Sequence, residues 1–292
     1  MRAVLFPGQG AQHAGMGSGL RDRHPDAFVE ASTVVGFDIA ALCDSGRCES
    51  ATLDCTRWAQ PAIVLVSALS ALDHGDAFCA AAGHSVGEYS ALVHVGSLTL
   101  RDALWLVLQR SDAMERATAE CPGRMASVLG LDRQLVWSIC SRTGASIAAE
   151  NAPGHVVVTG PNASVEEVTR LSAEAGAKVR MLKVSGPFHS SAMRLAVPSL
   201  TRALDAVDIK RPRLPFWSST RARVLDDPSA IRASLIDQLT EPVEWAATIR
   251  GMRNSGVADF HDAGPGNVLA GLVKRILREE VRDGAPVAGG TR

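Results

Sequence analysis

The chain has 292 residues, of which 46% are hydrophobic and 21% charged, so it can bury one large core or a large core with a smaller companion. Its formal net charge is −1, which excludes the broad basic surface typical of nucleic-acid-binding proteins. The apolar run before Pro7 is too short for a signal peptide, and no stretch approaches the ~18 apolar residues of a membrane span. We therefore expect a cytoplasmic protein with no nucleic-acid or membrane partner.

The six cysteines form no CxxC pair and have no histidine at a spacing typical of zinc sites. They also do not form the pattern of a disulfide framework. We expect them to be reduced and structural, and we expect the protein to need no metal or other cofactor.

The first third of the chain alternates strand and helix signals. Residues 3–6 predict a short buried strand, PGQG predicts a turn, and residues 60–72 predict a long apolar helix that begins at Pro61. Residues 78–82 then predict a strand and residues 86–95 a helix, an order typical of parallel α/β proteins. Thr99 and Asp102 fit a capping box at the start of the next helix, which is predicted to end near residue 116.

After a break at residues 121–123, six elements are expected in the order βαββαβ, which is that of a ferredoxin-like unit. The strands and helices expected there are 125–129, 132–143, 145–150, 156–159, 163–175 and 178–184, with a turn at 151–154. Further strands are expected at 214–218 and 258–261, and they resemble the α/β pattern of the first third of the chain. We therefore predict a large α/β-hydrolase-like domain with a parallel sheet, formed by 1–120 and 188–292, and a smaller inserted ferredoxin-like domain at 121–187.

The sequence GHSVG places Ser85 between Gly83 and Gly87, after a predicted strand and before a predicted helix. That is the nucleophile-elbow pattern, in which the two glycines allow a sharp turn that exposes the serine hydroxyl. The backbone N–H of Val86, at the start of the helix, then faces a developing oxyanion. On its own the pattern is equally compatible with a small residue in a tight turn.

Seven segments, in order, resemble the malonyl-CoA:acyl carrier protein transacylase family. They are FPGQGAQ (6–12), GHSVGEYSAL (83–92), Arg110, NAPGHVVVTG (151–160), GPFHS (186–190), QLTEPVEW (238–245) and GPGNVLAGLVKRI (264–276). Members of this family move a malonyl group from CoA to the phosphopantetheine thiol of an acyl carrier protein through an acyl-serine. The resemblance therefore implies malonyl-CoA and an acyl carrier protein as partners and Ser85 as the nucleophile.

The resemblance also implies that His189 is the base that activates Ser85. In the usual α/β-hydrolase order an acidic residue precedes a histidine near the chain end, whereas here about a hundred residues follow His189. The family pattern instead implies that the backbone carbonyl of Gln238 holds the imidazole, with Asn151 helping to order the same region. The residues alone leave an alternative open for each position. His189 could be a histidine whose hydrogen bonds are satisfied within a loop, and Gln238 could be an ordinary polar residue at a helix end.

For the oxyanion, PGQG offers a second donor beside Val86, because its glycines let the backbone of Gln9 bend inward at the carboxyl edge of the sheet. The alternative is an ordinary turn after the first strand. By the family resemblance, Phe188 is the bulky residue of malonyl-selecting members and narrows the space beside the acyl α-carbon. His84 is assigned to the substrate pocket, where it braces the elbow.

Arg110 shares an apolar helix stripe with positions 103, 106, 107 and 114, where an unpaired charge is costly. Its guanidinium could snorkel to water or pair with a local carboxylate. The matching arginine of the family binds the free carboxylate of malonyl, and this is the interpretation we favour for Arg110.

Near the C-terminus, Lys274, Arg275 and Arg278 form a basic turn on a predicted helix. The family is expected to meet acidic carrier proteins through such residues, and a solvated helix face is the alternative for each of them. We expect the protein itself to be a monomer.

Three positions depart from the family pattern: Ser111 replaces a common glycine, Val86 replaces the leucine of housekeeping members, and Ser219 replaces the usual asparagine. They leave the chemistry intact but slightly favour a stand-alone acyltransferase of a polyketide pathway over the fatty-acid enzyme. The donor is either malonyl-CoA or a modified malonyl-CoA. Two other functions also fit the sequence, a hydrolase that clears stalled acyl thioesters and a catalytically inactive docking protein.

Overall fold

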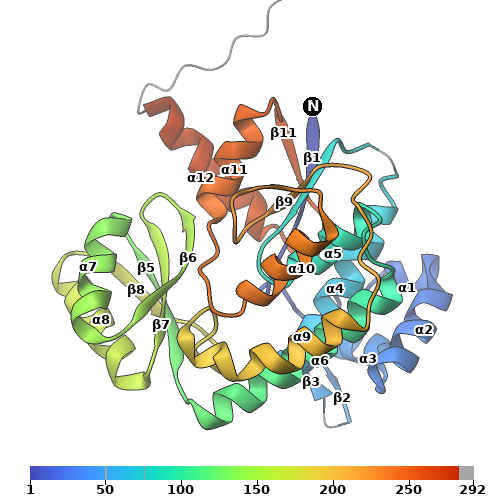
Figure 1. Ribbon diagram of the computed structural model, residues 1–292, viewed down its shortest axis with the longest axis horizontal. Helices are drawn as coiled ribbons and strands as arrows, with labels where there is room; N and C mark the ends of the chain where they lie inside the picture. The colour runs from blue at the N-terminus through green and yellow to red at the C-terminus, as the bar shows by residue number, and fades with distance from the viewer. Residues whose placement is uncertain (50, 76, 283–292) are drawn as a thin grey trace, which may run out of the picture.

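A five-stranded sheet lies at the centre of the larger of two lobes in the computed structural model, which describes residues 1–49, 51–75 and 77–282 (Figure 1). Its strand order is β10-β9-β4-β1-β11, and all neighbours are parallel except β10, which runs antiparallel to β9 at one edge. The middle strands β1 and β4 are buried along almost their whole length. The strands are β1 (Arg2–Phe6), β4 (Ala80–Gly83), β9 (Phe216–Ser218), β10 (Arg223–Leu225) and β11 (Asp259–Asp262).

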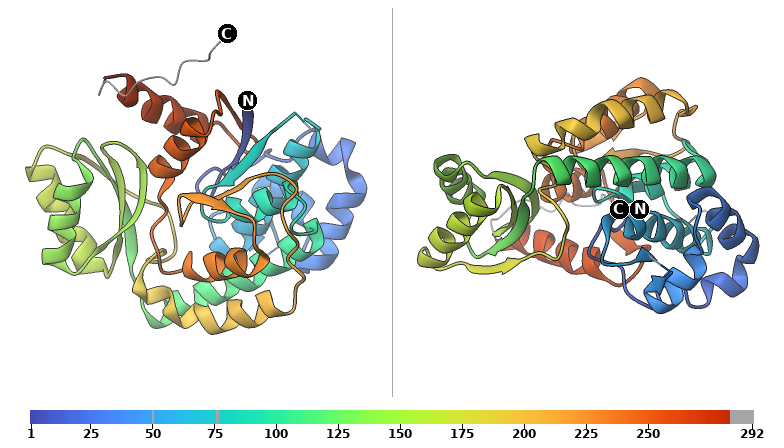
Figure 2. Two further views of the ribbon diagram at one scale, coloured as in Figure 1. Left: turned by 45° about the horizontal axis from the view of Figure 1, so that its top comes forward. Right: turned by 90° about the horizontal axis from the view of Figure 1, so that it is seen from below.

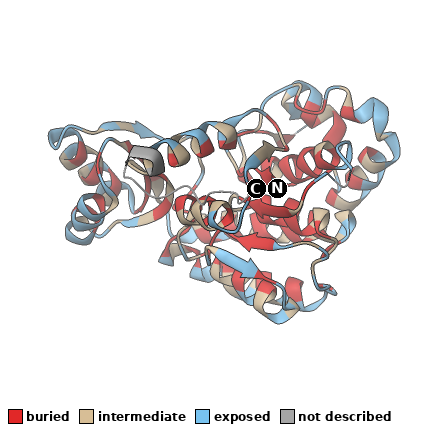
Figure 3. Cartoon of the chain, turned by 90° about the horizontal axis from the view of Figure 1, so that it is seen from above, coloured by how far each residue is buried: buried red, intermediate tan, exposed pale blue. Residues whose placement is uncertain are grey.

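Helices cover this sheet and pack on one another. α5 (Gly87–His94) lies against β1 and β4, and α12 (Val268–Arg282) lies against β11. α4 (Thr56–Leu72) packs on α5 and on the long α6 (Leu100–Glu120). Burial is concentrated on the strands and the inner helix faces, as Figure 3 shows. The other elements outside the small lobe are α1 (Leu20–Arg23), α2 (Pro25–Val35), α3 (Ile39–Ser45), β2 (Arg47–Cys48), β3 (Ala51–Thr52), η1 (Ser191–Ala196), α9 (Val197–Asp205), α10 (Pro228–Asp237) and α11 (Trp245–Asn254).

Helix α4 begins at Thr56 rather than at Pro61, so the predicted start is wrong. Pro61 lies inside the helix, where it has no N–H to donate to the carbonyl of Arg57 one turn earlier. The hydroxyl of Ser111 on α6 lies 3.3 Å from that carbonyl and 3.1 Å from the carbonyl of Leu108 on its own helix, so its single proton is shared between the two acceptors. The rule that places proline in the first helical turn fails here because a neighbouring helix satisfies the acceptor that proline leaves open.

The smaller lobe is built on a four-stranded antiparallel sheet with the strand order β6-β7-β5-β8. It has a hydrophobic cluster of its own, which includes Val128, Val136 and Val158. β6 runs through Ala152 into the predicted turn, and β8 ends at Met181, before the predicted residue 184. The elements follow in the predicted order as β5 (Arg124–Leu129), α7 (Arg133–Thr143), β6 (Ser146–Ala152), β7 (His155–Gly160), α8 (Asn162–Glu174) and β8 (Lys178–Met181).

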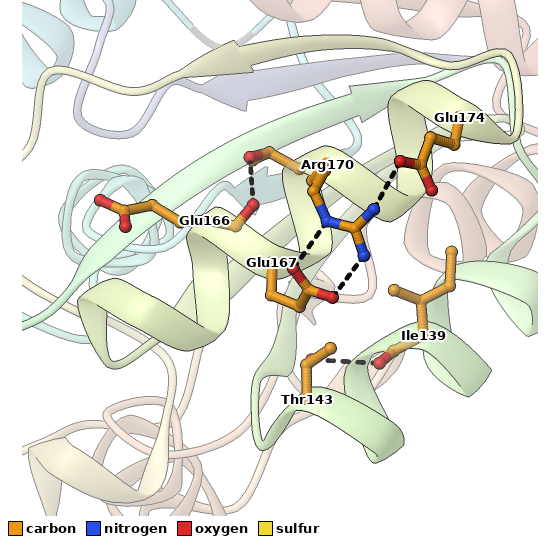
Figure 4. Close-up of polar contacts among 7 residues, drawn as sticks. Ile139, Thr143, Glu166, Glu167, Arg170 and Glu174 are labelled. Atoms are coloured by element: carbon orange, nitrogen blue, oxygen red, sulfur yellow. Dashed lines mark hydrogen bonds and ion pairs between the residues drawn. The ribbon is translucent and has the colours of Figure 1, made fainter.

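The outer face of α8 carries exposed ion pairs (Figure 4). Arg170 lies between Glu167 and Glu174, with nitrogen–oxygen distances of 2.6 and 2.5 Å. Water and dissolved salt screen exposed pairs at this helical spacing, so they contribute little to stability. This face is therefore a solvated helix surface.

The two lobes are joined by α6 and by a loop that follows α10. α6 crosses from the large lobe toward the small one and leads into β5 (Figure 2). The loop, residues 238–244, lies alongside β6, where Val243 and Ala149 form a parallel bridge. The N–H of Val243 donates to the carbonyl of Ala148 at 2.9 Å. The 238–244 loop is therefore an extra partner of the small sheet.

Side chains strengthen this junction. Arg133 on α7 donates to Glu150 on β6 at 2.7 Å and to Glu244, at the end of the 238–244 loop, at 2.5 and 2.6 Å. Both carboxylates are mostly buried, with side chains 16% and 20% exposed. Arg133 thus links one helix and one strand of the small lobe to the loop.

Membrane-spanning and metal-binding features are not found in the part of the chain that the structure describes. No helix there has the length and apolarity needed to cross a bilayer. Within the same residues, no three His, Cys, Asp or Glu side chains cluster as ligands of a metal ion would.

Candidate active site

The nucleophile elbow forms where β1 and β4 end side by side, with Phe6 level with Gly83. A Cβ on Gly83 would overlap the backbone of Gly87, and a Cβ on Gly87 would overlap the carbonyl of Phe6, so both positions require glycine. Between them, Ser85 has a φ of 52°, a left-handed conformation that is costly for a residue with a side chain. The tight turn places the serine at the carboxyl edge of the parallel strands, where the GxSxG pattern predicted it.

His189 contacts this serine directly, with its Nε2 2.9 Å from the Oγ of Ser85. Its Nδ1 lies 2.8 Å from the carbonyl oxygen of Gln238 and 3.2 Å from that of Glu241. Because carbonyl oxygens only accept, we assign the ring proton to Nδ1, which leaves Nε2 to accept the serine proton. Burial, together with the charge of Arg110, lowers the pKa of His189 to about 3, so the ring is neutral near pH 7 and its Nε2 lone pair is free to accept a proton.

Val86 and Gln9, the two predicted oxyanion donors, border the same edge of the sheet. Val86 follows the serine and is the N-cap of α5, so its N–H lies at the positive end of a helix. Gln9 follows β1 in a turn that lies close to the elbow, since a Cβ on Gly8 would overlap the carbonyl of His84. The side chain of Gln9 donates to Thr56 at 3.0 Å.

Arg110 is a buried cation beside the nucleophile. Its side chain is on a residue only 1% exposed, and its Nη2 lies 3.3 Å from the Oγ of Ser85. Nη1 donates to the amide oxygen of Gln60 at 2.7 Å, and Nη2 donates to that of Gln238 at 2.9 Å. Nε is buried with no hydrogen-bond partner among the described residues. Neither snorkelling nor an ion pair with a described carboxylate accounts for this arginine, since it is buried and its partners are neutral.

Gln60 is a site residue that the sequence interpretation missed. Its oxygen accepts from Arg110, and its Nε2 lies 3.4 Å from the amide oxygen of Gln9. A row of side chains therefore connects the arginine with the turn after β1. The available signal was a glutamine in an otherwise apolar helix, because a buried amide needs hydrogen-bond partners.

Glu88 is a second missed residue, on the first turn of α5. It is fully buried, and its Oε1 accepts from the N–H and hydroxyl of Ser219 at 2.5 and 2.9 Å. Its Oε2 accepts from Nε2 of Gln238 at 2.8 Å. Burial raises the pKa of Glu88 to about 7. In the sequence it resembles an ordinary acidic residue at a helix N-terminus, which is why its contacts could not be foreseen.

Asn151 contacts the other histidine of the site. Its Oδ1 lies 2.8 Å from Nε2 of His84, whose ring packs on Trp245. The N–H of His84 donates to the carbonyl of Phe6 at 2.9 Å, so this histidine braces the elbow. Asn151, near the end of β6, thus contacts the site through His84, and its predicted role in ordering the region of His189 stays a prediction.

The comparisons with known proteins agree with this geometry. The acyl transferase domain model matches residues 4–290 of the chain. The malonyl CoA-acyl carrier protein transacylase of Bacillus subtilis (strain 168) is 38% identical over 289 residues, which are 94% of this chain and 90% of that protein. The chain belongs to the malonyl-CoA:acyl carrier protein transacylase family. The family resemblance drawn from the sequence is thereby confirmed.

Two further matches are to proteins whose names refer to polyketide synthesis. Polyketide biosynthesis protein ThaF of Burkholderia thailandensis is 37% identical over 288 residues, which are 96% of this chain but 24% of ThaF. The solved structure of PlMCAT:AntF, a type II PKS acyl-carrier protein in complex with its malonyl-transacylase, matches with a TM-score of 0.89. Its sequence identity is 35%, and the match covers 95% of this chain and 93% of that chain.

Phe188 lies directly before the catalytic candidate His189, at the position where the family resemblance predicts a bulky residue. It is buried in the core of the large lobe, with 5% of its surface exposed. His189 itself has a φ of 55°, so it shares with Ser85 a left-handed backbone that few residues with side chains adopt. Such strain persists only where the surroundings fix the backbone, and here it marks both members of the contacting pair.

The basic turn expected to face a carrier protein lies on α12. Lys274 and Arg278 are exposed, whereas Arg275 is partly buried. The guanidinium of Arg275 donates to the backbone carbonyls of residues 153 and 154 at 3.0 and 3.1 Å. Arg275 therefore ties α12 to the β6–β7 turn, and the carrier contact predicted for it stays a prediction.

Proposed function

We propose that this protein transfers a malonyl group from CoA to the phosphopantetheine thiol of an acyl carrier protein through an ester on Ser85. The observation that carries the proposal is the buried Arg110, 3.3 Å from the nucleophile and bonded to neutral side chains. A buried cation whose direct partners are all neutral is costly, so the site favours an acyl group with a free carboxylate. The Bacillus subtilis relative is named for the same transfer.

In the first half-reaction, the hydroxyl of Ser85 gives its proton to Nε2 of His189 as its oxygen attacks the thioester carbon. The backbone N–H groups of Val86 and Gln9 stabilise the oxyanion. As the intermediate collapses, the carbon–sulfur bond breaks and the CoA sulfur takes the proton from His189. The malonyl group remains as an ester on the serine, with its carboxylate on Arg110.

In the second half-reaction, the carrier thiol gives its proton to His189 and its sulfur attacks the ester. The serine oxygen leaves with that proton, and the malonyl group is now a thioester of the carrier. The carbonyl of Gln238 accepts from Nδ1 throughout and stabilises the imidazolium that forms in each step. The protein groups and the two substrates account for every bond and proton, and we propose that no metal or redox cofactor takes part.

Intact-mass spectrometry tests this function. Incubation with malonyl-CoA alone is expected to add the mass of a malonyl group to the protein, and the Ser85→Ala variant is expected to gain none. Addition of a holo carrier protein is expected to move that mass to the carrier. Free malonate with an unmodified carrier would favour the hydrolase, and a folded protein that gains no mass would favour the inactive docking protein.

We further propose a polyketide pathway and malonyl-CoA itself as the donor. The support is the set of departures at Ser111, Val86 and Ser219, the relative ThaF, and the bulky Phe188 beside the site. Kinetics with a panel of carrier proteins and acyl-CoAs test both points. A higher kcat/KM with a fatty-acid carrier, or with methylmalonyl-CoA, would contradict them.

Lys274 and Arg278 are proposed to meet the acidic surface of the carrier protein, because both are exposed on α12. Replacing each with Glu is expected to raise the KM for the carrier while leaving acylation by malonyl-CoA unchanged. An unchanged KM for the carrier would remove α12 from the contact surface.

We also propose a fold type for each of the two lobes. The large lobe, residues 1–120 and 188–292, is assigned as α/β-hydrolase-like, and the small lobe, residues 121–187, as a ferredoxin-like insertion, with support from the sheet orders and the βαββαβ succession. We propose that the protein is a cytoplasmic monomer. Light scattering after size exclusion measures its mass, and a dimer at micromolar concentration would contradict the monomer.

A further inference from the structure

We propose that Glu88 is a positioning residue for malonyl transfer, and that through the side-chain amide of Gln238 it fixes the guanidinium of Arg110 for the acyl carboxylate. The inference rests on the proposed function, since it takes Arg110 as the group that binds this carboxylate. Glu88 acts through Gln238, because its Oε2 accepts from Nε2 of the amide whose oxygen accepts from Arg110.

The orientation of the Gln238 amide follows from its two neighbours. A guanidinium can only donate, so the amide oxygen must face Arg110, and an ionised carboxylate can only accept, so the amide nitrogen must face Glu88. The alternative orientation would set nitrogen donors against Arg110. Glu88 therefore selects one of two amide orientations, and only the selected one holds the arginine.

Gln238 connects this contact to the rest of the site. Its backbone carbonyl accepts from Nδ1 of His189 at 2.8 Å, and its Nε2 also lies 3.1 Å from the carbonyl of Ser85. One residue thus touches the base, the backbone of the nucleophile and the cation. A turned amide would loosen Arg110 first, since the contact to His189 comes from the backbone and survives.

Both oxygens of Glu88 are used as acceptors, which ties the arrangement to its ionised form. Oε1 accepts twice from Ser219, and Oε2 accepts from Gln238. A protonated carboxyl group carries a hydroxyl on one oxygen and so loses an acceptor on one side. Protonation of Glu88 is therefore expected to release the Gln238 amide.

The other titratable groups around Glu88 do not change charge near neutral pH. Arg110 on α6 remains a cation although burial lowers its pKa, and burial raises the pKa of Tyr89 on α5 above its usual range. His189, beyond Gln238, has a pKa lowered to about 3. Ser219 contributes only neutral donors. Because burial raises the pKa of Glu88 to about 7, we assign a transition in this range to Glu88, and its loss in Glu88→Gln tests that assignment.

The first experiment measures the rate of Ser85 acylation by malonyl-CoA, by quenched flow and intact mass, between pH 5.5 and 8.5. The parent rate is expected to fall as the pH drops through about 7, because the active form of Glu88 is ionised. Glu88→Gln carries one acceptor and one donor, like the protonated acid. Its rate at pH 8 is expected to lie about 10–100-fold below the parent and to show no transition near pH 7.

The second variant keeps the proposal testable even if Glu88→Gln does not fold. Gln238→Met removes the amide but keeps the backbone carbonyl that holds His189, and it is expected to abolish the same transition. The double variant is expected to be no slower than Gln238→Met alone, because Glu88 acts through that amide. Additive losses, or a transition that persists in either single variant, would overturn the proposal.

Selectivity separates positioning from a general loss of structure. Because acetyl-CoA lacks the carboxylate that Arg110 is proposed to bind, Glu88→Gln is expected to lower the preference for malonyl-CoA over acetyl-CoA about tenfold. A merely structural effect lowers both rates together. Asp262→Asn is the matched control: its partly buried carboxylate accepts from the N–H groups of Leu269 and Ala270 on α12, and its pH transition is expected to match the parent.

Failure of the inference is distinguishable from failure of the function. A parent protein that takes up no malonyl group at any pH would contradict the proposed transfer itself. A parent protein that is acylated, with an unchanged pH profile in Glu88→Gln, would contradict only the role of Glu88.

Discussion

Two arginines of this protein are both held by several hydrogen bonds, yet the charges of their partners differ. Arg133 lies between the carboxylates of Glu150 and Glu244, and its side chain is 39% exposed. Arg110 is 1% exposed, and its guanidinium meets two amide oxygens and a hydroxyl. Carboxylates raise the pKa of Arg133, whereas burial lowers the pKa of Arg110.

The difference shows how a structural cation can be told from a binding cation. The charge of Arg133 is already balanced, so that residue can only hold together the elements it links. The charge of Arg110 is balanced by none of its direct partners, and burial makes the deficit costly. A ligand that supplies the missing anion is therefore expected at Arg110 and not at Arg133.

The largest effect is expected when each arginine is truncated in turn, which tests whether the charge of its partners decides if an arginine binds substrate. Arg110→Ala is expected to lower kcat/KM for malonyl-CoA about 10³-fold, because losing a buried charge pair costs ~4 kcal/mol and each tenfold is worth about 1.4 kcal/mol. Arg133→Ala is expected to lower it less than about tenfold, since it only steadies the 238–244 loop. Steady-state transfer to the carrier measures both values.

Arg110→Lys sharpens the same prediction, because it keeps the charge but not the planar fork. Its loss is expected to lie between those of the parent and Arg110→Ala. Equal losses in Arg110→Ala and Arg133→Ala would show that the balance of charge does not decide which arginine binds substrate.

Stability is expected to rank the two positions in the opposite order. Arg133→Met leaves two neighbouring carboxylates without their cation, which is expected to cost about 1–2 kcal/mol of unfolding free energy. Arg110→Met is expected to cost less, since losing the amide contacts is offset by no longer burying a charge whose direct partners are neutral. Urea denaturation measures both, and a larger loss for Arg110→Met would reverse the interpretation.

The residue after Arg110 offers a smaller test on the same helix. Ser111 shares its hydroxyl proton between the carbonyl of Leu108 and the carbonyl that Pro61 leaves without a helical donor, so Ser111→Ala is expected to cost about 1 kcal/mol of stability. In a Pro61→Ala background the helix can donate its own N–H to that carbonyl, and the cost of Ser111→Ala is expected to shrink. Equal costs in both backgrounds would mean that the hydroxyl has another role.

Salt is expected to give the smallest effect. Raising NaCl from about 0.1 to 1 M shortens the screening length from roughly 10 to 3 Å, which weakens a partly exposed ion pair more than a buried one. The destabilisation caused by Arg133→Met is therefore expected to fall by a few tenths of a kcal/mol. The preference of the enzyme for malonyl-CoA over acetyl-CoA, which depends on Arg110, is expected to stay constant over the same range.

The elements that could be predicted from the sequence are those with local causes. The Ser85 elbow depends on two glycines, and the capping box at Thr99 depends on residues three positions apart, so both could be predicted without the fold. The order of the six elements in the small lobe could also be predicted, because strand and helix patterns follow one another clearly in that part of the sequence. The meeting of Ser85 with His189 came from the family resemblance, since no local pattern places residues this far apart in the chain together.

The contacts that could not be predicted are those that depend on tertiary packing. Glu88 resembles a first-turn acidic residue until Gln238 and Ser219 are brought to it from the far end of the chain. The contact of Asn151 with His84 could not be foreseen either, because β6 runs two residues further than the sequence suggests. Pro61 was misplaced because the compensating hydroxyl lies on another helix.

The parallel bridge between Val243 and Ala149 determines how this protein can be recombined with its homologues. A chimera that exchanges only residues 121–187 would leave the host's own 238–244 loop against a foreign strand, and that loop carries the two carbonyls that orient His189. Catalysis would suffer although no reacting side chain had been changed. Crossover points that transplant the insertion together with residues 238–244 keep each strand with the loop it evolved beside.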